Sequence, residues 1–199
     1  MTRADSGGPD AGSAPEAGNA PDAGSAPEAG NAPDAGSAPE AGNAPDALQE
    51  RYAPESICFG CGQANPEGLR LRSFPAGDSS EEVVAEWTPG PNHRSFPGIL
   101  NGGIIGTLLD CQCNWCAAHY FMRARGLDHP PVTVTAEYTV RLRKPTPSEA
   151  PVQLRARIAE AGERKVVVEA ELFAGGERTA TCSGTFVAIG ERHPAHGTR

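Results

Sequence analysis

The sequence lacks an excess of basic residues, an apolar leader and any long uninterrupted hydrophobic run. It holds 17 Lys and Arg against 25 Asp and Glu, which gives a formal net charge of −8. Because nucleic-acid binding needs many cations to neutralise phosphates, this balance predicts no nucleic-acid partner. No stretch has the apolar length of a secretory leader or a membrane span, so we expect a cytoplasmic protein with no membrane partner.

The cysteines do not form the pattern of a disulfide framework. They stand at positions 58, 61, 111, 113, 116 and 182. Three of them lie too close together to join distant loops, so we expect free thiols in a reducing compartment. Cys58 and Cys61 form one Cys-x-x-Cys pair, which could be half of a zinc site. Positions 111, 113 and 116 do not share one helix face, so the sequence predicts neither a metal nor a cofactor.

The N-terminal part consists largely of a repeat that cannot form a core. Residues 11–46 are three tandem copies of AGSAPEAGNAPD, with no Val, Ile, Leu or aromatic residue. Proline at every sixth position also prevents a continuous helix. Residues 1–47 carry a net charge of −7, whereas the remaining 152 residues carry −1. We expect a disordered acidic tail over residues 1–47, one folded domain over residues 48–190 and a frayed tail over residues 191–199.

The folded part is organised around the segment PGILNGGIIGTLLDCQCNWCAAHYFM, residues 97–122. Within this segment, an Asn-Gly-Gly turn at residues 101–103 precedes a long apolar run. At helical spacing the apolar residues fall on nearly every face, which predicts a helix enclosed by other elements. The segment holds one acidic residue, Asp110, with no Lys or Arg three or four residues away. Because a buried, unpaired carboxylate is costly, Asp110 is a candidate functional group.

Strands are predicted on both sides of this helix. Alternation of apolar and polar residues predicts two strands before it, over residues 69–74 and 82–87. Four more candidates follow the helix, over residues 132–143, 152–161, 165–174 and 178–189. This order predicts an α+β fold in which one antiparallel β-sheet is wrapped around one long central helix.

The element order and three motifs resemble the hotdog-fold acyl-CoA thioesterases, in particular the PaaI-like group. The motifs are CFGCG with NPEGL in residues 58–69, PGILNGGIIGTLLD in residues 97–110, and RKP in residues 143–145. The resemblance implies a hotdog fold and a metal-free enzyme that hydrolyses an acyl-CoA substrate to a carboxylic acid and free CoA. It also implies homodimers that pair into tetramers, with the active site at the dimer interface.

The resemblance also implies the roles of individual residues. The backbone N–H of Gly102 would polarise the thioester carbonyl from the helix N-terminus. Asp110 would act as general base on water or as nucleophile on the thioester carbon. Thr135 would orient the water or the acid. Gly103 and Ser95 would lie on the substrate side of the site.

Two positions depart from the pattern of the family. Asn101 stands where the family has His, and it cannot change its charge near neutral pH. It can serve as a helix N-cap or take part in catalysis, and both roles stay open. Cys111 stands where an acid or amide usually follows Asp110. Two alternatives to a thioesterase stay open: a catalytically silent acyl-CoA binder, and an enoyl-CoA hydratase or dehydratase. The lack of His at position 101 favours the silent binder. It counts against the hydratase or dehydratase, because those enzymes generally need a His with an acid.

Overall fold

The computed structural model describes residues 46–78 and 81–190. The predicted acidic repeat tail, up to residue 45, and the C-terminal tail from residue 191 lie outside the described residues. Within the described ranges, no helix combines the length and the apolar character that crossing a membrane requires.

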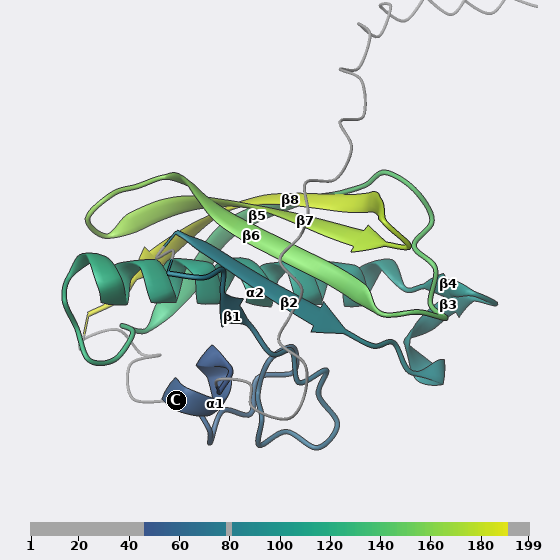
Figure 1. Ribbon diagram of the computed structural model, residues 1–199, viewed down its shortest axis with the longest axis horizontal. Helices are drawn as coiled ribbons and strands as arrows, with labels where there is room; N and C mark the ends of the chain where they lie inside the picture. Colours follow the sequence, from purple (N-terminus) through teal and green to yellow (C-terminus); the bar gives the residue numbers. More distant parts are fainter. Residues whose placement is uncertain (1–45, 79–80, 191–199) are drawn as a thin grey trace, which may run out of the picture. The chain divides into compact units, whose positions relative to one another are not determined.

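The described chain contains one long helix and a six-stranded sheet, which confirms the predicted α+β class (Figure 1). The elements are α1 (Leu48–Tyr52), β1 (Phe74–Pro75), β2 (Glu82–Trp87), the 3₁₀ helix η1 (Pro91–His93), β3 (Arg94–Phe96), β4 (Ile99–Leu100), α2 (Gly102–Ala124), β5 (Thr133–Leu142), β6 (Val152–Glu160), β7 (Lys165–Ala174) and β8 (Glu177–Ala188). All four strands predicted after the helix are present within one or two residues of their expected bounds.

The large sheet is antiparallel throughout, in the order β1-β2-β6-β7-β8-β5. Strands β6, β7 and β8 follow one another as hairpins, as the sequence predicts. Strand β5 instead pairs with β8. The connection from β5 to β6 therefore crosses to the other side of the β7–β8 pair, where β6 lies between β7 and β2. Strand β5 is therefore an edge strand. A separate ladder of β3 and β4 leads directly into α2.

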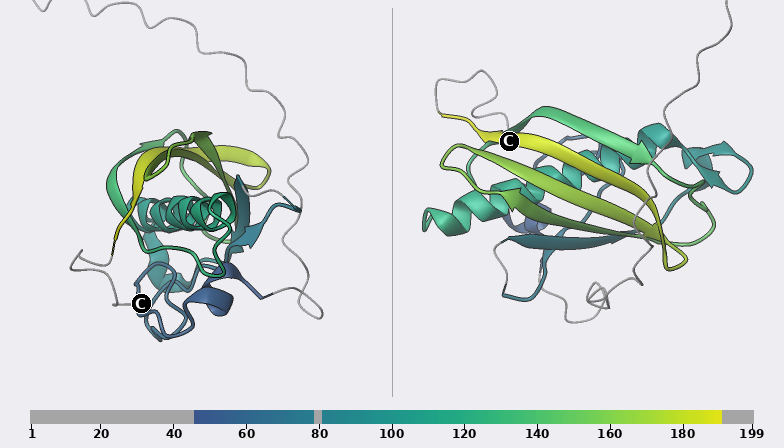
Figure 2. Two further views of the ribbon diagram at one scale, coloured as in Figure 1. Left: turned by 90° about the vertical axis from the view of Figure 1, so that its left-hand side faces the viewer. Right: turned by 90° about the horizontal axis from the view of Figure 1, so that it is seen from above.

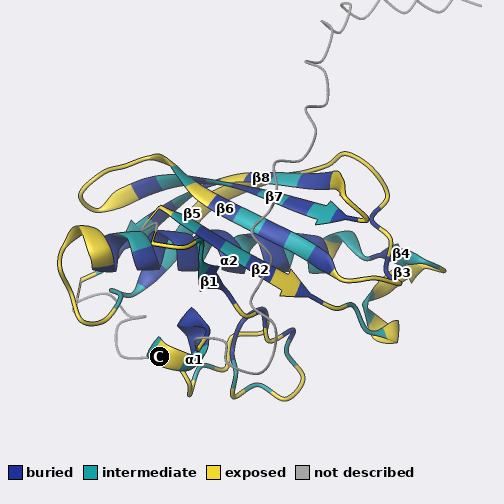
Figure 3. Cartoon of the chain, in the orientation of Figure 1, coloured by how far each residue is buried: buried dark blue, intermediate teal, exposed yellow. Residues whose placement is uncertain are grey.

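The concave face of the sheet curves around α2, as the end-on view of Figure 2 shows. Leu108 and Leu109 have no exposed surface, and Phe121 retains 1%. Alternate residues of β6 and β7 pack toward the helix, since the buried positions in those strands recur with period two. Figure 3 shows this buried layer along the helix and the sheet face that covers it. The predicted enclosure of the helix is confirmed.

The strand predicted over residues 69–74 is wrong for most of its length. Only Phe74 and Pro75 form β1, paired with β2. The alternation of burial is real, because Leu69 and Leu71 are buried while Arg70 is exposed. However, the Leu69 and Leu71 N–H groups donate to the carbonyls of a loop, residues 58–62, rather than to a strand. Arg70 also has a φ of +50°, which interrupts an extended conformation.

A buried polar network fastens α1 to α2. The Gln49 Nε2 amide donates to Ser73 Oγ at 2.9 Å, and the Ser73 N–H donates to Gln49 Oε1 at 2.8 Å. Ser73 Oγ in turn donates to Gln112 Oε1 of α2 at 2.7 Å. Because buried polar groups are costly without partners, this network holds the N-terminal segment of the domain against the central helix.

Candidate functional site

The N-terminus of α2 presents an unpaired backbone donor. Asn101 is the N-cap, and its Oδ1 accepts the N–H groups of Gly103 at 2.8 Å and Ile104 at 3.3 Å. Among the described residues, the N–H of Gly102 has no hydrogen-bond acceptor. The first N–H groups of a helix carry the positive end of its dipole. This end of α2 can therefore stabilise a negative oxygen.

Asn101 occupies one of its two predicted roles, that of helix N-cap, because its side-chain oxygen is engaged by the helix backbone. Its own N–H donates to the carbonyl of His93 at 2.9 Å. His93 in turn closes the preceding turn, since its Nδ1 accepts the Gly90 N–H at 2.8 Å and its ring packs on Trp87. These contacts fix the backbone that leads into Gly102.

Asp110 lies two turns further along α2 and faces β5. Thr135 Oγ1 donates to Asp110 Oδ1 at 2.8 Å, so the structure brings these two predicted site residues together. Burial raises the pKa of Asp110, the Thr135 hydrogen bond lowers it, and the nearby Cys58 sulfur raises it. No salt bridge neutralises Asp110 among the described residues. A carboxylate in this setting can take a proton from water or attack a carbonyl carbon.

A second bridge of the same shape lies one turn further along the helix. Thr133 Oγ1 donates to Asn114 Oδ1 at 2.8 Å, and the Asn114 amide donates to the Thr133 carbonyl at 3.3 Å. The two bridges are spaced by four residues on α2 and by two on β5. Only the bridge between Thr135 and Asp110 ends in a carboxylate. The bridge between Thr133 and Asn114 therefore serves as a control that shows what such a contact contributes to structure alone.

Gly102 and Asp110 are too far apart to act on one carbonyl within a single chain. Eight residues of α-helix, at a rise of 1.5 Å each, separate them by about 12 Å along the axis. Leu142 of the edge strand β5 lies beside Gly102, with its Cδ1 3.0 Å from where a Cβ on Gly102 would stand. Leu142 is 56% exposed and Tyr138 of the same strand is 46% exposed. This side of the domain thus presents apolar side chains on a free sheet edge next to the helix N-terminus.

The two residues predicted on the substrate side lie at this same end of α2. Gly103 is exposed in the first turn of the helix, and Ser95 is exposed in β3. Strand β3 lies beside β4 at this end of the domain (Figure 1). The ladder of β3 with β4 connects Ser95 to the helix start. The structure describes no contact between Ser95 and Asp110 or Thr135.

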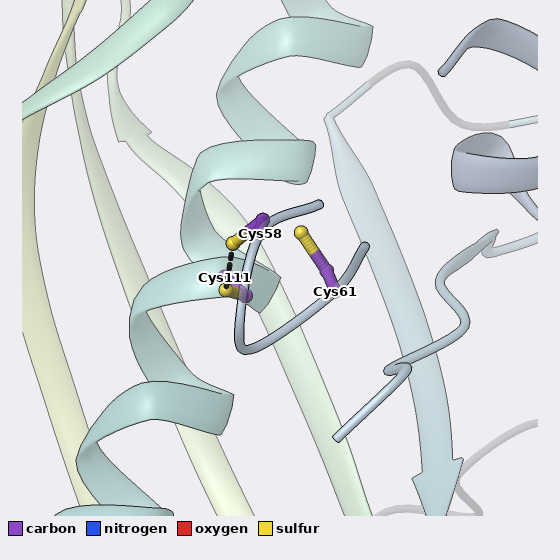
Figure 4. Close-up of side chains that lie close together, drawn as sticks. All are labelled: Cys58, Cys61 and Cys111. Atoms are coloured by element: carbon purple, nitrogen blue, oxygen red, sulfur yellow. Dashed lines mark hydrogen bonds between the residues drawn. The ribbon is translucent and has the colours of Figure 1, made fainter. Parts of the chain in front are cut away.

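Sequence reasoning missed a cluster of three cysteines. The sulfur atoms of Cys58, Cys61 and Cys111 lie within 4.8 Å of one another, and Figure 4 shows them between the loop of residues 58–62 and α2. Cys113 and Cys116 of α2 are not part of this cluster, and the Cys116 sulfur donates to the Ala156 carbonyl. The Cys-x-x-Cys pair of Cys58 and Cys61 is the part of the cluster that is visible in the sequence. Its placement beside Cys111 depends on tertiary structure.

The chain resembles known proteins in both sequence and structure. Residues 97–181 match the model of the thioesterase superfamily. A thioesterase superfamily protein from Shewanella loihica PV-4 is 29% identical over 68% of this chain and 96% of that one, with a TM-score of 0.51. A conserved protein from Pseudomonas aeruginosa is 25% identical over 61% of this chain and 90% of that one, with a TM-score of 0.52.

The PaaI protein of the phenylacetic acid degradation operon of Escherichia coli has the same fold. It is 15% identical over 61% of this chain and 81% of that one, with a TM-score of 0.52. No functionally curated protein matches the sequence. The hotdog architecture predicted from the sequence is thereby confirmed.

Proposed function

Because its residues 97–181 belong to the thioesterase superfamily, we propose that this chain hydrolyses an acyl-CoA thioester to a carboxylic acid and free CoA. The observation that carries the proposal is the bridge from Thr135 to Asp110, a half-buried carboxylate without a cationic partner among the described residues. The free N–H of Gly102 supplies the second element that acyl transfer needs, a donor for the developing oxyanion.

In the proposed reaction, the Asp110 carboxylate removes a proton from a water molecule as the water oxygen bonds to the thioester carbon. The carbonyl oxygen becomes an oxyanion and accepts a hydrogen bond from Gly102. When the tetrahedral intermediate collapses, the carbon–sulfur bond breaks and the CoA thiolate leaves. The thiolate takes the proton from Asp110, which restores the carboxylate and releases free CoA. Alternatively, Asp110 attacks the carbon directly, the carbon–sulfur bond breaks and the CoA thiolate leaves, and water then hydrolyses the resulting mixed anhydride. Thr135 fixes the carboxylate in both routes.

The site is proposed to be built from two protomers. The separation of about 12 Å along α2 prevents Asp110 and Gly102 of one chain from meeting the same carbonyl. Two copies paired edge to edge through β5, about a two-fold axis perpendicular to the strand, have antiparallel helices and would place Asp110 of one near Gly102 of the partner subunit. The unpaired edge of β5 and the exposed Leu142 and Tyr138 favour this pairing, since such an edge is otherwise open to other chains. We propose that such dimers pair further into tetramers.

The N-cap role of Asn101 supports an active enzyme over a silent binder. An N-cap needs only a side-chain acceptor, which Asn supplies as well as any residue. The position can therefore keep the oxyanion donor in place without a titrating side chain. We further propose a cytoplasmic location without nucleic-acid or membrane partners, in keeping with six cysteines that are all free.

A panel of acyl-CoA and enoyl-CoA thioesters tests the function. The full-length protein is incubated with each compound, and the acid, free CoA and hydrated product are separated by chromatography. Chromatography is preferred to a thiol reagent because the protein carries six free thiols of its own. Release of CoA with the matching acid is expected. Hydration without CoA release would show a hydratase, and tight binding without any product would show a silent binder; either result overturns the proposal.

A further inference from the structure

The cysteine cluster of Cys58, Cys61 and Cys111 has no role in the proposed hydrolysis, yet its geometry is that of a ligand set. The Cys58 and Cys111 sulfur atoms are 3.9 Å apart, and all three sulfurs lie within 4.8 Å of one another. A tetrahedral zinc ion with Zn–S bonds of about 2.3 Å holds its sulfur ligands ~3.8 Å apart. A small inward movement of Cys61 therefore brings the three sulfurs to the spacing of a zinc site.

The loop that carries the first two cysteines is shaped to bring its backbone against the third. A Cβ on Gly60 would stand 2.3 Å from the Cys111 sulfur, and one on Gly62 would stand 2.4 Å from the Cys58 nitrogen. Both positions therefore require glycine. The Gly62 N–H donates to the Cys58 carbonyl at 2.8 Å and closes the turn. The turn is thus built for close approach to α2, rather than being a surface loop that happens to contain cysteines.

Hydrogen-bond donors surround the cluster and are aimed at sulfur. The backbone N–H groups of Gly60 and Cys61 point at the Cys58 sulfur. The Trp115 indole Nε1–H of α2 donates to the Cys61 sulfur at 3.3 Å. Such donors orient thiolates and partly offset their charge, as do the residues that hydrogen-bond to metal-bound cysteines.

The described residues supply three ligands of a tetrahedral site and leave the fourth position to solvent. Within residues 46–78 and 81–190, no other His, Cys, Asp or Glu joins the three sulfurs as a group. Cys58 is exposed, so a water molecule can reach the cluster from solvent. Soft thiolate ligands select thiophilic ions over Mg²⁺ or Ca²⁺, which require oxygen.

We propose that Cys58, Cys61 and Cys111 bind one thiophilic divalent cation, Zn²⁺ by preference, with water as the fourth ligand. Binding releases the three thiol protons and involves no oxidation or reduction. The ion ties the loop of residues 58–62 to α2 at the residue next to Asp110, so it acts as a structural clamp on the helix that carries the carboxylate. The proposal differs from the sequence-based expectation of no metal.

The test measures bound metal and does not depend on thioesterase activity. The full-length protein, fully reduced, is loaded with Zn²⁺ or Co²⁺ and passed through metal-free buffer, and retained metal is determined by plasma emission. One ion per chain is expected, and the Co²⁺ form should show the sulfur-to-cobalt charge-transfer absorption and the intense visible bands of a tetrahedral thiolate site. Zn²⁺ should also raise the temperature of unfolding.

Cys111→Ser should lose the retained ion, whereas Cys182→Ser is the matched control and should keep it. Cys182 is also buried, at 4% exposure against 6% for Cys111, but it belongs to β8 and not to the cluster. Should Cys111→Ser fail to fold, alkylation of the wild-type protein gives the same answer: Zn²⁺ should protect Cys58 and Cys61 from iodoacetamide. A wild-type chain that retains no ion, a variant at Cys111 that retains it fully, or unprotected thiols would each overturn the proposal.

Discussion

Replacing Gly102 with proline tests whether its N–H stabilises the reaction. Gly102 is the first residue of α2, and Asn101 before it is extended, with φ −67° and ψ 134°. Helices accept proline at their first position, and proline requires an extended residue before it, so the backbone can remain in place. The substitution deletes one backbone donor and leaves the Asn101 cap and Asp110 unchanged.

The expected loss follows from the role of a single oxyanion donor. Removing one such donor lowers kcat by about 10²–10³-fold, equivalent to about 2.7–4 kcal/mol of transition-state stabilisation. Gly102→Ala is the matched control, because it keeps the N–H. Both substitutions place a Cβ about 3.0 Å from the Leu142 side chain, whose exposed end can move aside. The alanine variant should therefore keep most of the wild-type kcat.

The assay compares kcat and KM of the three proteins on the best thioester of the panel, with thermal unfolding as the check on folding. A proline variant that unfolds at the wild-type temperature and retains the wild-type kcat would refute the role of the Gly102 N–H. An equal loss in both variants would instead assign the effect to crowding against Leu142.

Three further predictions follow from contacts on and around α2. Thr135→Val removes a hydrogen bond to a charged group worth about 1.5–3 kcal/mol, so kcat should fall by about 10- to 150-fold, while Thr133→Val should leave it nearly unchanged; equal losses would mean that both bridges are only structural. Leu142→Glu places a charge on the apolar edge of β5 and should give monomers by light scattering, whereas Leu127→Glu, on an exposed residue after α2, should leave the mass unchanged; an unaltered dimer in the first variant would contradict the proposed interface. Gly60→Ala forces a Cβ within 2.3 Å of a sulfur and should destabilise the fold by about 1–3 kcal/mol in thermal unfolding; an unchanged stability would show that the loop does not pack as described.

The central helix and its flanking strands could be predicted because their signals are local. The Asn-Gly-Gly turn marks the start of α2, its apolar residues fall on nearly every face, and Gly126 with φ +62° lies just past its end. Strand β7 was predicted at its observed bounds, because its alternation lies between two turns. In each case the residues that specify the element lie within it or next to it.

The remainder depends on contacts between residues far apart in the chain. Alternation over residues 69–74 predicts a strand, but the backbone partners of Leu69 and Leu71 are loop carbonyls. The pairing of β5 with β8 follows from closing the sheet around α2 and not from a hairpin signal. Likewise, the meeting of Cys58 and Cys111, 53 residues apart, requires the loop to be placed on the helix.

The turnover of Asp110→Asn tests the proposed function most directly. The substitution removes the negative charge but keeps the shape, and the Thr135 hydroxyl can still donate to the amide oxygen that replaces Asp110 Oδ1. Asn114→Ala, on the neighbouring bridge, is the control. We predict that Asp110→Asn remains folded and loses nearly all thioester hydrolysis, while the control retains it. Wild-type kcat in Asp110→Asn on every thioester tried would contradict the mechanism.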